Sequence, residues 1–146
     1  MLETSEKIFV AGHQGMVGSA IVKNLESKGF NNLITADKIL LDLTDQKQVN
    51  NFFRSENIDQ LYIAAAKVGG IYANSVYPGQ FIYQNLMIQS NLINAAYKSN
   101  LKKLLFLGSS CIYPINSPQP IHESQLLAGP LEETNRAYAV AKISGI

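Results

Sequence analysis

The sequence predicts an α/β fold in which helices cover both faces of a parallel, doubly wound sheet. Three observations support this fold class. Short apolar runs alternate with segments of helical periodicity, no hairpin signal joins successive apolar runs, and a glycine-rich turn separates the first apolar run from the first helical segment. Parallel strands need crossover connections, which are expected to be right-handed. Alternation alone is also compatible with an α/β domain that binds no nucleotide, so the motifs must decide.

The predicted strands are four short runs, of which the first is almost continuously hydrophobic. This composition is typical of parallel strands, which are buried on both faces. Each run is followed by a helical segment or a loop, as βαβ units require. The runs lie at residues 7–11 (KIFVA), 32–36 (NLITA), 60–65 (QLYIAA) and 104–107 (LLFL).

The predicted helices follow from apolar residues at three- and four-residue spacing. The first ends at Gly29, a glycine stop, and Thr44 or Asp45 is positioned to cap the second. Four prolines between residues 113 and 130 predict a long loop without regular structure, which is typical of a functional segment. A last helix begins in residues 136–146. The positions that mark the first three helices are Val17, Ile21 and Leu25; Val49, Phe52 and Phe53; and Ile82, Leu86, Ile93 and Ala96.

Composition narrows the class of protein. With 146 residues, 47% of them hydrophobic, the chain is long enough for one domain with a sizeable core. Twelve basic and 11 acidic residues are interspersed, which does not favour binding to nucleic acid or a membrane surface. The single cysteine, Cys111, excludes an intrachain disulfide, and neither a signal peptide nor a bilayer-spanning stretch is recognisable. We therefore expect a cytoplasmic protein whose partners are small molecules or other subunits.

The glycine-rich turn is the first candidate site. Its spacing is GxxGxxG, between a predicted strand and a predicted helix, which favours a Rossmann-like dinucleotide site over a turn without a ligand. Glycines permit a tight turn, a close approach of backbone N–H groups to a pyrophosphate, and close packing of helix and strand. The helix N-terminus also favours an anion. The candidate cofactor-binding residues here are Gly12, His13, Gln14, Gly15, Met16, Val17 and Gly18.

Past the second predicted strand, two adjacent residues favour different cofactors. Asp37 occupies the place of an acidic residue that binds the adenine ribose of NAD, whereas Lys38 suits the 2′-phosphate of NADP. A surface pair without a ligand is the alternative for both. Asp42 and Leu43 are candidates for the adenine end of the site, although Asp42 is equally suited to a solvated turn. The residues do not decide between NADP(H) and NAD(H).

Small polar residues follow the fourth predicted strand, and a tyrosine and a lysine follow the long loop. Ligands bind at the carboxyl edge of such a sheet, so Leu107, Gly108, Ser109 and Ser110 are candidate cofactor contacts, with Cys111 next to them. Tyr138 and Lys142 are four residues apart, on one helical face. We expect the lysine ammonium and the cofactor's charge to lower the tyrosine pKa, so that proton transfer to a carbonyl becomes feasible while Ser109 donates a second hydrogen bond.

Five strings of the sequence together resemble one family. GHQGMVGSAI, AAAKVGGI, YQNLMIQSN, FLGSSCIYP and AYAVAKISGI are similar to the GDP-L-fucose synthase branch of the extended short-chain dehydrogenase/reductases. The resemblance covers nearly the whole chain. It implies a Rossmann fold, a homodimer, NADP(H), and conversion of GDP-4-keto-6-deoxy-D-mannose to GDP-L-fucose by epimerisation and 4-keto reduction. It also implies catalytic roles for Ser109, Cys111, Tyr138 and Lys142, with Lys142 contacting the cofactor as well.

The chain also departs from that family. The family's chains are longer, so the resemblance implies that residues 1–146 are an incomplete NAD(P)-binding domain without the substrate-binding region. Gln14 stands where many members carry a basic residue, which leaves Lys38 to pair with the 2′-phosphate. We assign no catalytic role to His13 or His122. Two alternatives stay open: a dinucleotide-binding module that catalyses nothing, and an epimerase or dehydratase acting on another nucleotide sugar.

Overall fold

The computed structural model describes residues 4–146 and confirms the α/β fold with a parallel sheet. Strands and α-helices alternate through the first two thirds of the chain, and three short 3-10 helices precede the last α-helix. In chain order the elements are β1 (Ile8–Ala11), α1 (Met16–Ser27), β2 (Leu33–Ile34), α2 (Gln46–Glu56), β3 (Gln60–Ile63), α3 (Ile71–Val76), α4 (Pro78–Lys98), β4 (Lys103–Phe106), η1 (Ser110–Ile112), η2 (Glu123–Gln125), η3 (Glu133–Asn135) and α5 (Arg136–Ile143).

The sheet has four strands in the order β2-β1-β3-β4, and every neighbouring pair is parallel. From β1 the chain moves outward to β2 on one side and then returns to add β3 on the other side. The order therefore reverses between β1 and β3, and the carboxyl ends of these two strands form the topological switch point. Ligands of open α/β sheets bind at such a point.

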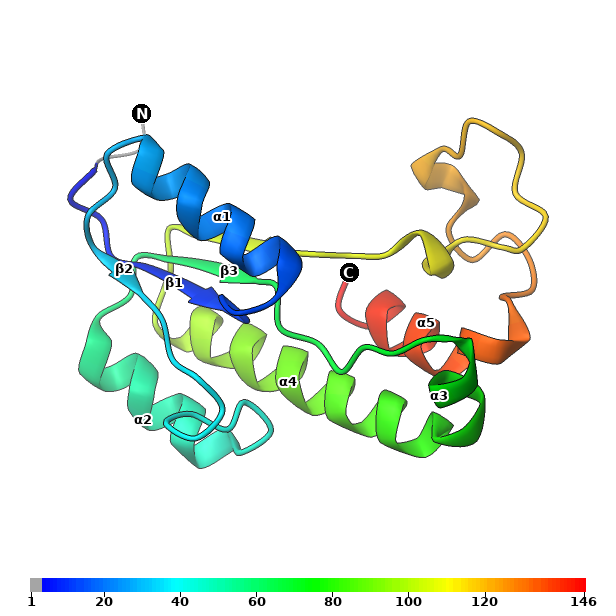
Figure 1. The fold of residues 1–146 in the computed structure, drawn as a ribbon, viewed down its shortest axis with the longest axis horizontal. Helices are drawn as coiled ribbons and strands as arrows, with labels where there is room; N and C mark the ends of the chain where they lie inside the picture. Colours follow the sequence, from blue (N-terminus) through cyan, green and yellow to red (C-terminus); the bar gives the residue numbers. More distant parts are fainter. Residues whose placement is uncertain (1–3) are drawn as a thin grey trace. The chain divides into compact units, whose positions relative to one another are not determined.

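The helices form a layer on each face of the sheet, as Figure 1 shows for α1 on one face and α2 with the second half of α4 on the other. Residues of β1 and β3 alternate between these two layers. Phe9, Leu61 and Ile63 pack with α2 and α4, whereas Ile8, Val10 and Tyr62 pack on the α1 side. Burial on both faces explains why β1 is continuously apolar and why β3 is apolar after its buried Gln60.

The chain divides into two compact units. Within the described residues, unit 1 consists of residues 4–66 and 87–107 and contains the sheet, and unit 2 consists of residues 67–86 and 108–146. Helix α4 is shared, because its first half belongs to unit 2 and its second half to unit 1. In neither unit does the described part of the chain contain a helix long and apolar enough to cross a membrane.

Several element boundaries differ from the sequence prediction. Strand β2 has only two residues, because only Ile8 and Phe9 of β1 pair with it. Helix α3 was not predicted, and a 3-10 turn, η2, interrupts the loop that was expected to lack regular structure. Asp45, and not Thr44, caps α2, since its carboxylate accepts the N–H groups of Lys47 and Gln48 at 2.8 and 3.1 Å. The glycine stop after α1 is confirmed, with Gly29 at φ +83°.

Candidate active site

The glycine-rich turn lies between β1 and α1, at the switch point of the sheet. Gly12 has φ +86°, a conformation that favours glycine, and a Cβ on it would lie 2.6 Å from the backbone nitrogen of Ala65, just past β3. A Cβ on Gly18 would lie 2.1 Å from the carbonyl oxygen of Gly12. Two glycines thus permit the close packing of loop, helix and strand that the spacing predicted.

The same turn fits a pyrophosphate. Gly15 is the N-cap of α1 and has no side chain with which to bond the N–H groups of the first helical turn. Those groups and the positive end of the helix dipole favour an anion. His13 Nδ1 is buried without a hydrogen-bond partner among the described residues, while Gln14, Met16 and Val17 are exposed. The residues present therefore suit a dinucleotide, with the phosphates at the N-terminus of α1.

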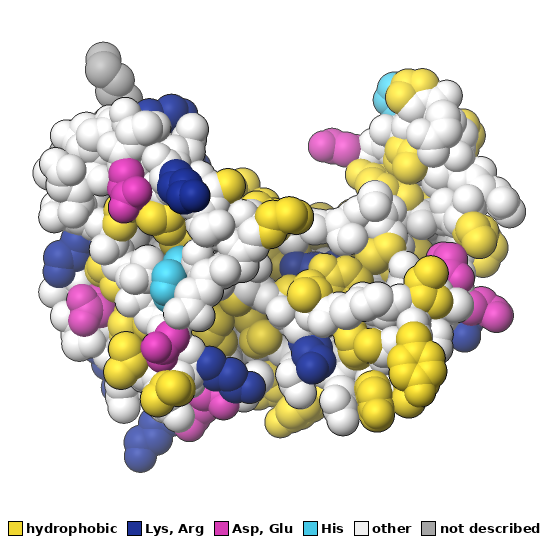
Figure 2. Space-filling model, in the orientation of Figure 1, with side chains coloured by type: hydrophobic (Ala, Val, Ile, Leu, Met, Phe, Trp, Pro, Cys, Tyr) yellow, Lys and Arg dark blue, Asp and Glu magenta, His cyan; other side chains and the backbone are white. Residues whose placement is uncertain are grey.

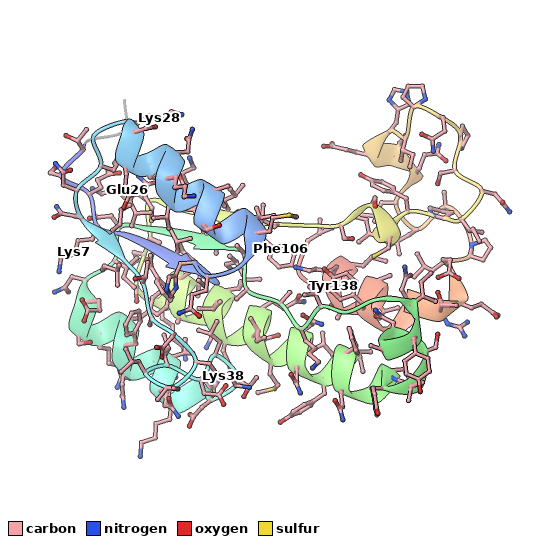
Figure 3. The ribbon with its side chains drawn as sticks, viewed as in Figure 1. Lys7, Glu26, Lys28, Lys38, Phe106 and Tyr138 are labelled. Atoms are coloured by element: carbon pink, nitrogen blue, oxygen red, sulfur yellow. The ribbon has the colours of Figure 1, made fainter. Side chains whose placement is uncertain are left out.

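The candidates for the adenine end are also in unit 1. Asp37 uses its carboxylate locally, accepting the N–H groups of Ile39 and Leu40 at 2.9 and 3.0 Å, whereas Lys38 is exposed on the loop after β2 (Figure 3). Asp42 accepts the N–H and the hydroxyl of Thr44, and these bonds lower the pKa of its carboxyl group. Asp42 is thus a turn residue in this structure. Leu43 is half-buried beside it, and its carbonyl accepts Asn91 Nδ2 at 3.0 Å.

The candidates that follow β4 lie in unit 2, except the cofactor contact Leu107, which is the last residue of unit 1. Ser109 caps the short helix η1, which begins at Ser110, and its Oγ lies 3.1 Å from Cys111 Sγ. Cys111 is a free, half-buried thiol. Gly108 and Ser110 are exposed on either side of Ser109. The turn after β4 therefore presents a hydroxyl and a thiol side by side.

Helix α5 packs against η1 and carries both Lys142 and Tyr138, of which Tyr138 is labelled in Figure 3. The ammonium of Lys142 lies 5.9 Å from the centroid of the Tyr138 ring, so the predicted proximity of the pair is confirmed. Lys142 is 4% exposed. Burial lowers the pKa of its ammonium group, and the electrostatic interaction with Cys111 raises this pKa by a smaller amount. Four candidates of the predicted reactive centre, Ser109, Cys111, Tyr138 and Lys142, thus share one unit.

The chain by itself raises the pKa of Tyr138, whereas the lowering was expected with the charge of a bound cofactor as well. Burial raises the pKa of Tyr138 above its ordinary value, Cys111 raises it further because a thiolate opposes a second anion, and a hydrogen bond with Ser109 lowers it. Spacing placed lysine beside tyrosine correctly but carried no information on desolvation. In this structure Tyr138 favours its protonated form, which is the form that donates a proton to a carbonyl.

Two buried asparagines with structural roles were not predicted from the sequence. Asn85, 2% exposed, accepts the Lys67 N–H at 2.9 Å and donates to the carbonyls of Lys67 and Phe81 at 3.0 and 2.8 Å. Asn74 donates to the carbonyls of Gly69 and Gly70 at 2.8 and 3.1 Å. Together they hold the backbone of the loop that follows β3 in the chain. Both fall in or beside strings quoted for the resemblance, yet nothing in their spacing distinguishes them from surface amides.

Comparison with known proteins agrees with this geometry. The model of the NAD dependent epimerase/dehydratase family matches residues 8–146, which is nearly the whole chain. The chain belongs to this family. The match includes the glycine turn and extends through Tyr138 and Lys142.

Individual relatives are similar over the same range. The chain is 60% identical over its whole length to a protein named putative GDP-L-fucose synthase 2 from Arabidopsis thaliana, and 57% identical over 98% of its length to GDP-L-fucose synthase from Escherichia coli. It spans 44% of the length of each. A solved structure of a GDP-mannoheptose C4 reductase from Campylobacter jejuni with NADP bound matches 99% of the chain and 46% of the reductase, with 41% identity and a TM-score of 0.95.

Proposed function

We propose that this chain is the nucleotide-binding portion of an NADP(H)-dependent epimerase-reductase that converts GDP-4-keto-6-deoxy-D-mannose to GDP-L-fucose. The observation that carries the proposal is the identity of 57–60% to proteins named GDP-L-fucose synthase. The geometry supports it, because a glycine turn suited to a pyrophosphate occurs in the same chain as a serine, cysteine, tyrosine and lysine set in one unit. The full activity is proposed for a protein of the relatives' length.

The cofactor is proposed to be NADP(H), and the nicotinamide, when bound, supplies hydride. Gly12 to Gly18 hold the phosphates at the N-terminus of α1, and exposed Lys38 meets the 2′-phosphate. Asp42 and Leu43 lie toward the adenine. Leu107, Gly108, Ser110 and Lys142 complete the contacts. NAD(H) is the alternative cofactor, but Asp37 already bonds its own turn, which disfavours a ribose role for it.

Each of the reactive residues is proposed to have a different role in the reaction. Tyr138, held protonated, donates its phenolic proton to the 4-keto oxygen as that oxygen gains charge, and Ser109 donates a hydrogen bond to the same atom. The Lys142 ammonium over the ring stabilises the phenolate that Tyr138 becomes. Cys111 moves a proton at the carbon next to the carbonyl during epimerisation.

The proposal is tested first by calorimetric titration of the chain with NADPH and with NADH. We expect NADPH to bind more tightly, and Lys38→Ala to reduce that difference. If neither nucleotide binds a folded chain, the dinucleotide site is refuted. Binding followed by no turnover of the GDP-keto-sugar, in a chain extended to the relatives' length, would instead indicate a non-catalytic module.

Catalytic roles are tested in the extended chain. Tyr138→Phe removes the proton donor and should lower kcat by about a hundredfold or more. Tyr97→Phe, at an 80% exposed position on α4, is the control and should leave kcat unchanged.

A second candidate function is the C4 reduction of a different GDP-sugar. The 41% identical Campylobacter structure favours it, since that protein is named a GDP-mannoheptose C4 reductase. Reduction alone requires the tyrosine and lysine but no proton exchange at carbon. Cys111→Ser therefore separates the candidates: it should abolish solvent deuterium incorporation at C3 and C5 if epimerisation occurs, and change nothing if the enzyme only reduces.

We also propose a cellular location, partners and a domain organisation for the enzyme. We place it in the cytoplasm, with a GDP-sugar as substrate and without nucleic-acid or membrane partners. The chain is proposed to be one NAD(P)-binding domain, residues 1–146, whose substrate-binding region corresponds to the further length of the relatives. A homodimer is proposed for the full enzyme.

A further inference from the structure

The segments proposed to hold the cofactor in unit 1 carry more acidic than basic side chains. Residues 12–18 contain no lysine, arginine, aspartate or glutamate, and residues 37–48 contain three aspartates and two lysines, a net charge of −1. Neither of the chain's arginines, Arg54 and Arg136, lies in these segments. Arginine binds a phosphate through two parallel hydrogen bonds, so its absence leaves the two lysines as the cations that a 2′-phosphate can meet here.

The first aspartate of the second segment is fixed by the turn that contains Lys38. One carboxylate oxygen of Asp37 accepts the N–H groups of Ile39 and Leu40 at 2.9 and 3.0 Å. The carbonyl of Asp37 accepts the N–H of Leu41 at 2.9 Å. Lys38 is the exposed residue that follows Asp37 within this turn. The Asp37 carboxylate therefore stays next to Lys38, because moving away would break both of its hydrogen bonds.

A second aspartate, Asp42, is also held near Lys38. Its carboxylate accepts the N–H and the hydroxyl of Thr44 at 2.9 and 2.7 Å, and its own N–H donates to Gln48 Oε1 at 3.1 Å. The hydrogen bonds from Thr44 lower the pKa of the Asp42 carboxyl group, and the Lys38 ammonium lowers it further. Asp42 is therefore ionised at neutral pH and offsets part of the charge of Lys38. Figure 2 shows acidic side chains beside a basic one where Figure 3, in the same orientation, labels Lys38.

These charges act on the one group by which the two nicotinamide dinucleotides differ. The 2′-phosphate of NADPH carries about −1.5 to −2 charges at pH 7, where NADH has a hydroxyl. Lys38 attracts that phosphate, whereas the carboxylates of Asp37 and Asp42 repel it. Between exposed charges each such interaction changes affinity by only about two- to fivefold, and salt screens it. A lysine opposed by two carboxylates thus provides little net attraction for the 2′-phosphate.

We propose that Asp42 is a specificity-determining residue that weakens the binding of a 2′-phosphate, so that the site accepts NADH nearly as well as NADPH. The pair of Asp42 and Lys38, and not Lys38 alone, then sets the ratio of the two dissociation constants. Asp37 acts in the same direction as Asp42. The proposal rests on the proposed dinucleotide site, and it leaves the roles of the reactive residues unchanged, because the hydride chemistry is the same with either nucleotide.

Calorimetric titration of the chain with NADPH and with NADH, at low and at physiological salt, tests the proposal. For the wild-type chain we expect the two dissociation constants to differ by less than about tenfold. Asp42→Asn removes the charge but keeps the side-chain oxygen that accepts Thr44, so the turn is preserved, and circular dichroism verifies the fold. We expect this variant to bind NADPH about fivefold more tightly and NADH unchanged, and to lose the gain as salt is raised.

The matched control is Glu26→Gln, which also removes one carboxylate from unit 1, at an exposed position near the end of α1 and far from Lys38 (Figure 3). It should leave the ratio of the dissociation constants unchanged. Adding Lys38→Ala to Asp42→Asn should abolish the gain in NADPH affinity, because the lysine then no longer attracts the phosphate.

Two results overturn the role of Asp42. One is a wild-type preference for NADPH of about tenfold or more, and the other is an Asp42→Asn variant with the wild-type ratio of dissociation constants. Binding of neither nucleotide to the folded chain would refute the dinucleotide site itself and this proposal with it. That result is distinct from binding of both nucleotides with an unchanged ratio, which refutes only the role of Asp42.

Discussion

Gly18 illustrates how single residues set the geometry of the candidate cofactor site. Its missing Cβ leaves room for the carbonyl oxygen of Gly12, which also accepts the Gly15 N–H at 3.0 Å. The backbone of the turn is thus pressed against the first turn of α1. The sequence spacing predicted this role for glycine at position 18, and the structure identifies the atom that requires it.

Gly18→Ala should destabilise unit 1 and weaken NADPH binding. The added methyl would lie 2.1 Å from the Gly12 oxygen, which is backbone and has no rotamer by which to move away, so the helix must shift. We expect a loss of about 1–3 kcal/mol in the free energy of unfolding. Urea denaturation measures it. Gly79→Ala in α4 is the control, since its Cβ meets nothing within 4 Å, and it should cause no loss. Equal stability of the two variants would contradict the packing argument.

Tyr138 shows that the burial of a side chain, and its effect on the pKa, is not predictable from sequence spacing. The four-residue spacing to Lys142 was sufficient to predict that the two side chains meet. Burial was not predictable from that spacing, because desolvation depends on what η1 and α5 exclude from solvent, and in the chain by itself it raises the pKa of Tyr138. The proximity of Tyr138 and Lys142 was thus predictable from the sequence, whereas the effect of burial on the Tyr138 pKa was not.

At the scale of elements, Asn85 links helix α4 to the loop that follows β3. One side chain satisfies three backbone groups, namely the N–H and carbonyl of Lys67 and the carbonyl of Phe81. Phe81 in turn packs on Gly69, where a Cβ would lie 2.9 Å from the ring. The loop is therefore fixed by helix side chains rather than by regular structure of its own.

Asn85→Ala should destabilise the chain by about 2–3 kcal/mol, because it leaves buried backbone groups without partners. Thermal or urea unfolding measures the loss, and hydrogen exchange should show faster exchange of the Lys67 amide. Asn94→Ala, at a half-buried position on the same helix, is the comparison and should have a smaller effect. An unchanged exchange rate of the Lys67 amide would show that the loop does not depend on the hydrogen bonds of Asn85.

The helices and strands also show which elements hydrophobic periodicity predicts and which it does not. The long, strongly patterned helices α1, α2 and α4 were predicted in their observed places, and the predicted end of α1 at Gly29 and cap of α2 at Asp45 match the structure. Helix α3 was missed because its six residues, Ile71–Val76, are too few to establish a period. Strand β2 was predicted too long, since its extent is set by pairing with β1 and not by its own composition.

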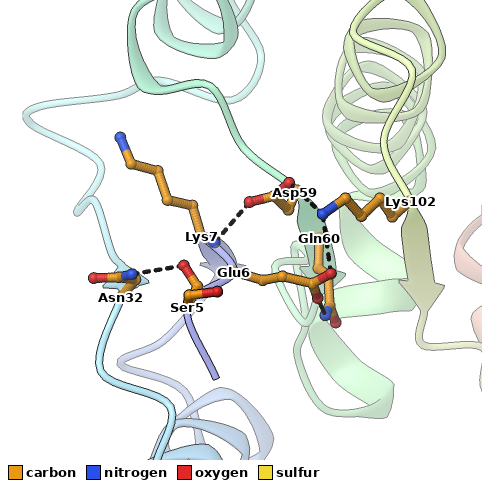
Figure 4. A network of polar contacts seen from close by, with 7 residues as sticks. All are labelled: Ser5, Glu6, Lys7, Asn32, Asp59, Gln60 and Lys102. Atoms are coloured by element: carbon orange, nitrogen blue, oxygen red, sulfur yellow. Dashed lines mark hydrogen bonds and ion pairs between the residues drawn. The ribbon is translucent and has the colours of Figure 1, made fainter. Parts of the chain in front are cut away.

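At the scale of the whole molecule, distant segments of unit 1 are joined by polar contacts where β1 and β3 begin (Figure 4). Lys102 bridges Glu6 and Asp59 at 3.1 and 3.0 Å, Asp59 also accepts the Lys7 N–H at 2.9 Å, and buried Gln60 donates to Glu6. These residues are up to 96 positions apart in sequence. No periodicity or motif indicated the network, because it arises only when the strands align.

The network should make stability depend on pH in the acid range. Hydrogen bonds from Lys7 and Lys102 lower the pKa of Asp59, and those from Gln60 and Lys102 lower the pKa of Glu6. A carboxyl group whose pKa is lower in the folded state stabilises the fold above its unfolded pKa, about 4, and this contribution is lost as pH falls through the folded value.

Asp59→Asn should therefore lower the free energy of unfolding near neutral pH and have progressively less effect below about pH 4, where the wild-type carboxylate is itself protonated. Urea unfolding of both proteins across this range measures the difference. Lys102→Met and the double variant complete a cycle, whose coupling energy should be present at neutral pH and vanish in acid. Because Lys102 is exposed, salt should weaken the coupling as well. A coupling that persists unchanged in acid would mean that the Asp59 side chain stabilises unit 1 through packing and its neutral hydrogen bonds, and not through its charge.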